Sequence, residues 1–165
     1  MPVPEAEPAV AAHRGALDES AARGVPAHVT VLFPFLPPDR IDVTTIDRLA
    51  AALDAVTAFD CTFARVGWFG EEVAWLDPEP REPFLALTDA VRRSFPGYEP
   101  YGGAYVTQVP HLTIGMATLG DVRTAVQEVA AQLPITAHID RVLVMGGALG
   151  SGRWETLASL PLGEG

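Results

Sequence analysis

The chain has 165 residues, of which 48% are hydrophobic, and its formal net charge is −10 at pH 7. This length and composition predict a soluble globular protein with a substantial core. With 21 acidic and 11 basic residues, the surface opposes the neutralisation of phosphates, which excludes long duplex nucleic acid as a partner.

The first half of the sequence predicts two helices and three extended segments. Pro8 suits the first turn of an Ala-rich helix, and residues Thr44–Asp47 are typical of a capping box that starts a second helix. A turn at Phe69–Glu71 separates two stretches in which apolar and polar residues alternate, and these stretches predict a pair of strands. In chain order, the predicted elements are a helix over 8–20, a strand over 27–33, a helix over 44–56, and strands over 59–68 and 72–76.

The second half predicts the same elements in the same order. Apolar residues at helical spacing follow Pro83, and a later helix is stopped by Pro134. The Gly-rich residues 146–152 follow a strand without opening a helix, so we interpret them as a hairpin loop and not as a phosphate-binding loop. The predicted elements are a helix over 84–95, a strand over 110–116, a helix over 122–133, and strands over 138–145 and 154–160.

Because the same order of elements occurs twice, the sequence predicts an α+β fold of two pseudo-symmetric lobes. Each lobe would be a mainly antiparallel sheet with helices on the outside, and the active-site groove would lie between the lobes. We expect one bilobal domain over 1–165, with the first lobe near 1–80 and the second near 81–165, and we leave open whether strands are exchanged between them. The alternative is that the repeated order is a by-product of ordinary helix and strand alternation.

Two short motifs sit on corresponding predicted strands. His28-Val29-Thr30-Val31 and His111-Leu112-Thr113-Ile114 share the pattern His-x-Thr followed by a β-branched residue. Side chains alternate between the two faces of a strand, so each His lies on the same face as its Thr. Two such strands brought together would form a small polar cleft that contains two imidazoles.

This pattern favours phosphodiester chemistry by general acid–base catalysis. One neutral imidazole can take a proton from the attacking hydroxyl or water, and a second, protonated imidazole can donate a proton to the leaving oxygen. The hydroxyls of Thr30 and Thr113 can bind the non-bridging phosphate oxygens. The scheme requires neither a metal ion nor a nucleotide cofactor, and we expect none.

These motifs resemble those of the 2H phosphoesterases, which include 2′-5′ RNA ligase-like proteins and 2′,3′-cyclic phosphodiesterases. The resemblance extends to Phe33-Pro34-Phe35 after the first motif, Pro110 before the second, and the closing strand pair. It implies a bilobal fold with an internal repeat, with His28 and His111 as the acid–base pair and both Thr on the phosphate. Relatives usually begin with a strand, where this chain has only Pro2-Val3-Pro4, so we expect that edge strand to be absent or very short.

Other residues are weaker candidates for contact with substrate. Tyr101 and Tyr105 can stack on a base, although Tyr-Gly-Gly can also be a plain turn. Arg14 and Arg153 can neutralise a terminal phosphate, or else form surface ion pairs. Phe35 is a further candidate for contact with substrate. We expect structural or surface roles for His13, His138 and Trp154.

Two residue types narrow the chemistry further. Lysine is absent, which excludes a P-loop lysine, a Schiff base and a lysyl-nucleotide intermediate. Cys61 is the only cysteine, so an internal disulfide and a thiolate zinc cluster are excluded, and its apolar setting predicts a buried thiol. The sequence lacks a membrane-spanning run, and residues 1–5 lack the features of a signal peptide, so we expect a cytoplasmic protein with no membrane partner.

The leading hypothesis is a metal-independent phosphoesterase that opens a cyclic phosphate, or joins such an end to a 5′-hydroxyl through a 2′-5′ linkage. Its partner would be a small nucleotide or an RNA end. Two alternatives stay open: a metal-dependent hydrolase with both His as ligands, and a module that binds a nucleotide or phosphometabolite without turnover. The sequence leaves the oligomeric state, the natural substrate, and the division of acid and base roles undecided.

Overall fold

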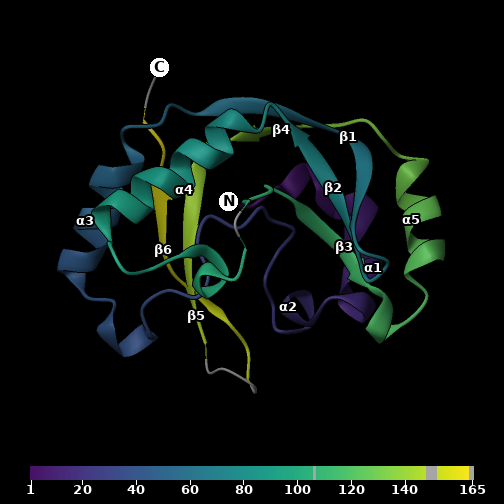
Figure 1. The fold of residues 1–165 in the computed structure, drawn as a ribbon, viewed down its shortest axis with the longest axis horizontal. Coiled ribbons are helices and arrows are strands. Elements are labelled where there is room, and N and C mark those ends of the chain that lie inside the picture. The colour runs from purple at the N-terminus through teal and green to yellow at the C-terminus, as the bar shows by residue number, and fades with distance from the viewer. Residues whose placement is uncertain (106, 148–151, 164–165) are drawn as a thin grey trace.

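The computed structural model describes residues 1–105, 107–147 and 152–163 (Figure 1). An antiparallel sheet of four strands has the order β3-β2-β1-β4, and two further strands, β5 and β6, form a separate antiparallel pair. The strands are β1 Phe59–Phe69, β2 Val73–Glu79, β3 Leu112–Met116, β4 Ile135–Ile139, β5 Arg141–Gly146 and β6 Glu155–Pro161. The fold is therefore α+β with mainly antiparallel sheets, as expected from the sequence.

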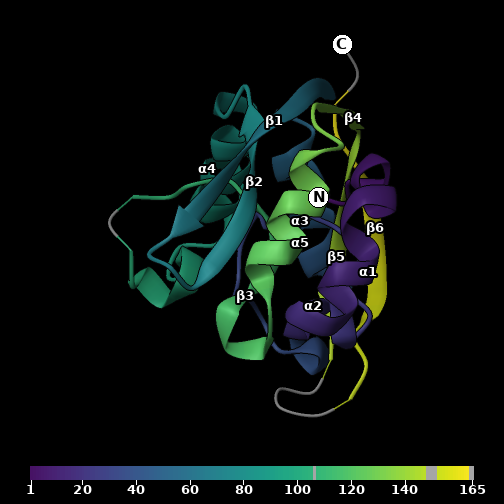
Figure 2. The same ribbon diagram turned by 90° about the vertical axis from the view of Figure 1, so that its right-hand side faces the viewer.

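Helices pack beside each sheet (Figures 1 and 2). Helices α1 and α5 contact β3 and each other, whereas α3 contacts α4 and β6. The buried apolar side chains of all these elements join in one hydrophobic cluster, so both sheets share a continuous core. The helices are α1 Glu7–Leu17, α2 Glu19–Ala22, α3 Val43–Leu53, α4 Glu82–Ser94 and α5 Val122–Ala130, with short 3₁₀ turns at Pro4–Ala6, Pro38–Arg40, Pro100–Gly103 and Ala117–Leu119.

The four-stranded sheet takes strands from both halves of the sequence. The β1–β2 hairpin of the first half pairs with β3 on one side and with β4 on the other. Long-range pairing of this kind is not visible in local sequence patterns, because it depends on which strand edges meet. A boundary near residue 80 therefore does not separate one sheet from the other.

The strand predicted over 138–145 is in fact two strands. It breaks at Asp140, where the chain leaves β1 as its partner and joins β6. The alternation of buried residues shifts by one position at this point. Odd-numbered residues, Ala137 and Ile139, are buried before the break, and an even-numbered residue, Val142, is buried after it. Such a shift in the apolar residues of a sequence indicates that the chain passes from one sheet to another, since a continuous strand keeps its apolar residues at every second position.

The first motif lies in an extended segment, not in the strand predicted over 27–33. Among the residues that the structure describes, its regular pairing is limited to an isolated antiparallel bridge between Pro2 and His28. On either side of the bridge, the amide of Val3 donates to the carbonyl of Ala27, and that of Val29 to the carbonyl of Met1. The N-terminal edge strand is thus very short, as the sequence led us to expect, and so cannot pair with the full length of the segment.

Helix α3 begins two residues earlier than the predicted capping box requires. The N-cap is Asp42, whose carboxylate accepts a hydrogen bond from the amide of Thr45 at 2.8 Å. The prediction that Thr44 starts the helix was wrong, because the nearby carboxylate already occupies the capping position. Pro8 does lie in the first turn of α1, as predicted.

Helices α4 and α5 lie within three residues of their predicted bounds. The single helix predicted over 8–20 is wrong, because the chain is extended at Asp18, which ends α1 and caps α2 with its carboxylate. Of the predicted loop over 146–152, residues 148–151 lie outside the described residues, and the two strands that it joins, β5 and β6, are antiparallel partners. None of the helices in the described ranges combines the length and hydrophobicity needed to cross a bilayer.

Candidate active site

Both motifs divide their side chains between the core and a cavity. Val29 and Val31 are buried, as are Leu112 and Ile114. The His and Thr of each motif are only half-buried. The alternation predicted from the sequence is confirmed in both motifs, even though the first is not part of a regular strand.

The two motif histidines are held in the same way by the backbone. Nδ1 of His28 lies 2.8 Å from the carbonyl oxygen of Pro26, and Nδ1 of His111 lies 2.8 Å from that of Val109. A carbonyl oxygen only accepts, so Nδ1 carries the proton in each ring and donates it. Nε2 is then the nitrogen left to exchange a proton with a ligand.

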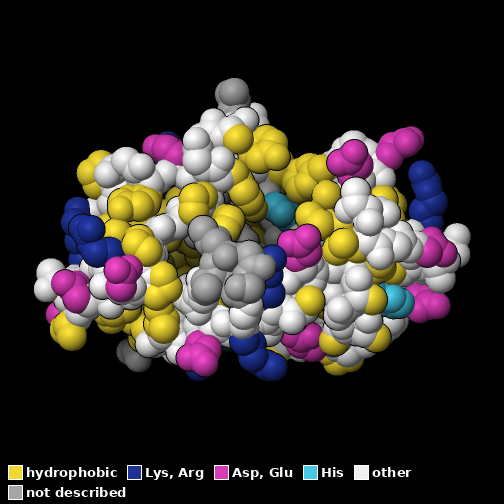
Figure 3. All heavy atoms as spheres, turned by 90° about the horizontal axis from the view of Figure 1, so that it is seen from below, with side chains coloured by type: hydrophobic (Ala, Val, Ile, Leu, Met, Phe, Trp, Pro, Cys, Tyr) yellow, Lys and Arg dark blue, Asp and Glu magenta, His cyan; other side chains and the backbone are white. Residues whose placement is uncertain are grey.

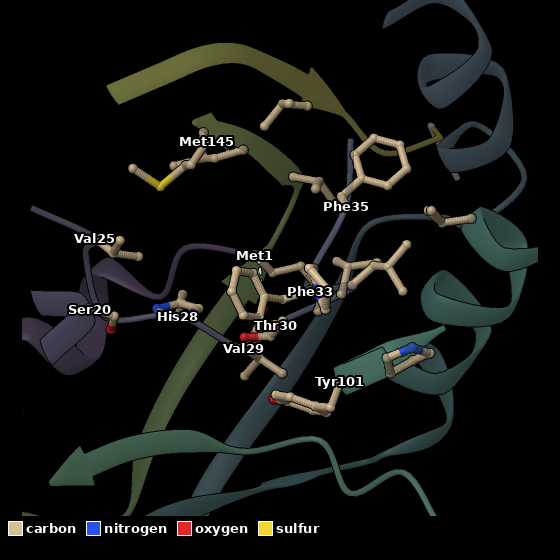
Figure 4. Close-up of a pocket in the computed structure, with 18 of the residues that line it drawn as sticks. Met1, Ser20, Val25, His28, Val29, Thr30, Phe33, Phe35, Tyr101 and Met145 are labelled. Atoms are coloured by element: carbon tan, nitrogen blue, oxygen red, sulfur yellow. Dashed lines mark hydrogen bonds between the residues drawn. The ribbon is translucent and has the colours of Figure 1, made fainter. Parts of the chain in front are cut away.

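Both motifs line one cavity of about 1350 Å³. His28, Thr30, His111 and Thr113 are all among its lining residues. In Figure 3 the molecule is hollowed, with hydrophobic side chains gathered around the opening and a histidine visible inside. Figure 4 shows His28 and Thr30 in this cavity together with Phe33 and Tyr101. All four motif residues thus face the same cavity.

Burial favours the neutral form of both imidazoles in the unliganded site. It is the main cause that lowers the pKa of His28 to about 4, and the hydrogen bond to the Pro26 carbonyl offsets it only in part. Burial also lowers the pKa of His111, with the carbonyl of Val109 again opposing it. A bound phosphate anion would raise both pKa values, because a nearby negative charge favours the imidazolium form.

A family model described as the 2′-5′ RNA ligase superfamily matches residues 2–148. The chain belongs to this superfamily. This confirms the resemblance inferred from the two His-x-Thr motifs. A search of curated proteins finds no match.

Solved structures with a similar fold include members of the same group. The chain is 16% identical to Escherichia coli LigT in complex with 3′-AMP, with a TM-score of 0.51 and 92% of both chains covered. For apo E. coli LigT the identity is 15% and the TM-score 0.51, over 93% of this chain and 92% of the other. A crystal structure described as a phosphoesterase is 16% identical, with a TM-score of 0.50, over 93% of this chain and 94% of that one. At this identity the likeness shows a LigT-like fold.

In this member of the 2′-5′ RNA ligase superfamily, aromatic rings surround the second histidine. The ring of Phe69 meets that of His111 edge-on at 4.9 Å between centroids, and Trp75 lies 6.0 Å away. Gly67 makes this possible, because a Cβ at that position would clash with the Trp75 ring. Sequence reasoning missed Phe69 and Trp75, since their contact with His111 depends on the pairing of β2 with β3.

The loop before the second motif brings two tyrosines to the cavity. Tyr101 and Tyr105 both line it, and their rings meet edge-on at 5.6 Å. Tyr101 has a φ of 52° within a turn, and its amide donates to the carbonyl of Phe33. Burial raises the pKa of Tyr101, whereas a side-chain hydrogen bond with Thr30 opposes that rise. The segment is thus both a turn and part of the cavity wall.

Of the other candidate residues, Phe35 lines the cavity and Arg14 does not. Phe35 packs edge-on against Phe95 and Tyr98. Arg14, in contrast, is only 2% exposed, is not among the lining residues, and binds the carboxylate of Asp18 at 2.9 Å. The expectation that Arg14 neutralises a phosphate is therefore corrected, because its guanidinium is committed to a buried ion pair.

Arg153 also lies away from the cavity lining. It is exposed, and its side chain lies against Gly24. Trp154 lines the cavity and packs on Phe33, with ring centroids 6.0 Å apart. Its packing role agrees with the sequence prediction.

The other ionisable candidates lie elsewhere. His13 contacts Glu128 at 3.2 Å, and the exposed His138 contacts Asp60 at 2.7 Å. Cys61 is buried, as predicted, and burial raises the pKa of its thiol to about 12. In the part of the chain that the structure describes, His, Cys, Asp and Glu side chains form no group of three that could hold a metal ion.

Proposed function

We propose that this protein is a metal-independent phosphoesterase that acts on cyclic phosphates or 2′-5′ linkages of nucleotides or RNA ends. The observation that carries the proposal is the shared geometry of His28 and His111. Both rings line one cavity, and in both the Nδ1 proton is held by a backbone carbonyl. Two imidazoles with free Nε2 atoms suit a reaction that takes one proton and gives another. In this proposal the two sheets belong to two lobes on either side of the cavity.

In this proposal His28 is the base and His111 is the acid. His28, whose pKa is lowered to about 4 by burial, is neutral at pH 7 and takes the proton of the attacking water through Nε2. The water oxygen bonds to phosphorus, and one ester P–O bond of the five-membered ring breaks. His111 in its protonated form donates its proton to the leaving oxygen. The hydroxyls of Thr30 and Thr113 donate to the non-bridging oxygens, where charge gathers in the transition state.

One observation favours a module that binds without turnover. Burial lowers the pKa of both histidines, which disfavours the imidazolium form that an acid requires. A phosphodiester in the cavity would oppose this effect by favouring the imidazolium form of one ring. Turnover thus requires that the bound substrate favours the protonated form of the imidazole that acts as the acid.

The test is hydrolysis of 2′,3′-cyclic AMP in the presence of EDTA. The nucleotide is a reasonable first substrate because E. coli LigT was crystallised with 3′-AMP. We expect turnover by the wild type, and a loss of roughly 10²- to 10⁴-fold in His28→Ala and in His111→Ala. Equal rates in all three proteins would reject the assignment. Tight binding of the nucleotide with no product at any pH would establish the binding module.

A further inference from the structure

The cavity extends far beyond the two motifs, and its far end is apolar. Besides the His-x-Thr residues, its lining includes side chains from α3, α4, β5 and β6, which lie on the opposite side of the molecule from β3 and α2 (Figure 1). We propose that the substrate carries a large apolar group, such as an alkyl chain, next to its phosphodiester. This inference rests on the proposed function, because it assigns a substrate class to the same site.

The apolar end is built from side chains that still have room to contact a ligand. Leu143, Val144 and Met145 are half-buried in β5 and line the cavity, as do Leu36 and Ile41 from the segment before α3. In the view of Figure 4, Met145 and Phe35 lie above His28 and Phe33, and Tyr101 lies below them. Burial of an alkyl chain against such side chains releases ordered water and is favourable by about fourfold in affinity for each methylene.

Charges around the cavity argue against a longer nucleic acid. The cationic side chains that line it, Arg23 and Arg92, are both ion-paired: Arg23 with Glu19 at 3.3 Å, and Arg92 with Glu99 at 2.6 Å. Four carboxylates line the cavity, including those of Glu19 and Glu99, and the chain has no lysine. A second phosphate beyond the one at the histidines would therefore meet negative charge without a free cation to bind it.

A nucleoside fits the apolar end less well than an alkyl chain does. A base presents ring N–H and carbonyl groups, and burial of these groups without partners is unfavourable. The side chains of Leu36, Ile41 and Leu143–Met145 have no N–H or O–H groups to offer. An aliphatic group requires no such partners, so these five side chains favour it over a base and a ribose.

The experiment compares three substrates that share the five-membered cyclic phosphate. They are glycerol 1,2-cyclic phosphate, its 3-O-octyl ether used below its critical micelle concentration, and 2′,3′-cyclic AMP. We expect kcat/KM for the octyl ether to exceed that for the parent compound, and that for the nucleotide, by at least about tenfold, since burial of only two or three methylenes provides this gain.

A matched pair of variants locates the effect. Met145→Gln keeps the length of the side chain but makes it polar, and we expect the octyl-to-parent ratio of kcat/KM to fall at least about fivefold. Leu157→Gln makes the same kind of change on the neighbouring strand, where Leu157 is 44% exposed and does not line the cavity. That variant should keep the wild-type ratio.

The outcomes separate the two proposals. If the parent compound and the nucleotide are both opened but the octyl ether gains nothing, the apolar substrate class is overturned and the phosphoesterase stands. An equal fall of the ratio in Met145→Gln and Leu157→Gln would also overturn it. If none of the three compounds is opened, the phosphoesterase itself is wrong and the substrate assignment fails with it.

Discussion

The hydroxyl of Thr88 donates a 2.9 Å hydrogen bond to the carbonyl of Val31, the last residue of the first motif. The same hydroxyl accepts a 2.8 Å bond from the side chain of Gln108, three residues before His111. Thr88 is completely buried in α4, so water cannot replace either bond. One hydroxyl therefore joins the backbone of one motif to the segment that leads into the other.

Replacement of Thr88 by Val should destabilise the protein by about 1–3 kcal/mol, because it leaves the carbonyl of Val31 buried without a donor. Urea denaturation measures this free energy of unfolding. Thr88→Ser, which keeps the hydroxyl, is the control and should lose much less. If Val and Ser prove equally destabilising, packing of the methyl group and not the hydrogen bond is what Thr88 contributes.

The stability of the protein should depend on pH through His28. Burial lowers its pKa to about 4 in the folded protein, from an ordinary value of 6.5. Between these values the unfolded chain binds more protons, so the contribution is fully present above pH 6.5 and is lost as the pH falls toward 4. Since His28 is only half-buried, we expect a loss of about 2 kcal/mol between pH 7 and pH 4.5.

The His28→Gln variant isolates that contribution, since other groups titrate over the same range. Urea denaturation of both proteins at pH 7 and at pH 4.5 should show a smaller loss of stability in His28→Gln than in the wild type. Equal losses would mean that the imidazole of His28 titrates normally in the folded protein.

The motif threonines should contribute to turnover more than to substrate binding. Thr30→Val and Thr113→Val each remove a hydroxyl proposed to stabilise the transition state, and we expect kcat on a cyclic phosphate to fall about 10²-fold. Thr30→Ser and Thr113→Ser retain the donor and should recover most of the rate. A rise in KM at unchanged kcat would assign the hydroxyls to binding of the ground state instead.

The cap of α3 offers a test of the fold that is independent of activity. Asp42→Ala removes the carboxylate that accepts from the Thr45 amide, and should lower the free energy of unfolding by about 1 kcal/mol. Thr44→Ala, at the position favoured by the sequence pattern, should change stability by less. Thermal denaturation of the two variants ranks them, and the opposite order would restore the predicted capping box.

The local features of this protein could be predicted from its sequence. Hydrophobic periodicity located the helices and the β1–β2 hairpin, and alternation within each His-x-Thr motif correctly assigned His28 and Thr30 to a different face from Val29 and Val31. These features follow from interactions between residues close in the chain, which spacing records directly. The two motifs were also enough to indicate the family.

Tertiary structure decided how the segments meet. The break at Asp140, the pairing of β2 with β3 that brings Phe69 and Trp75 to His111, and the burial of Arg14 against Asp18 all depend on contacts between segments or on burial within the fold. So does the apolar extension of the cavity, whose walls come from four elements. Such contacts are selected by the packing of the whole core, because each segment has several partners that its local sequence would accept.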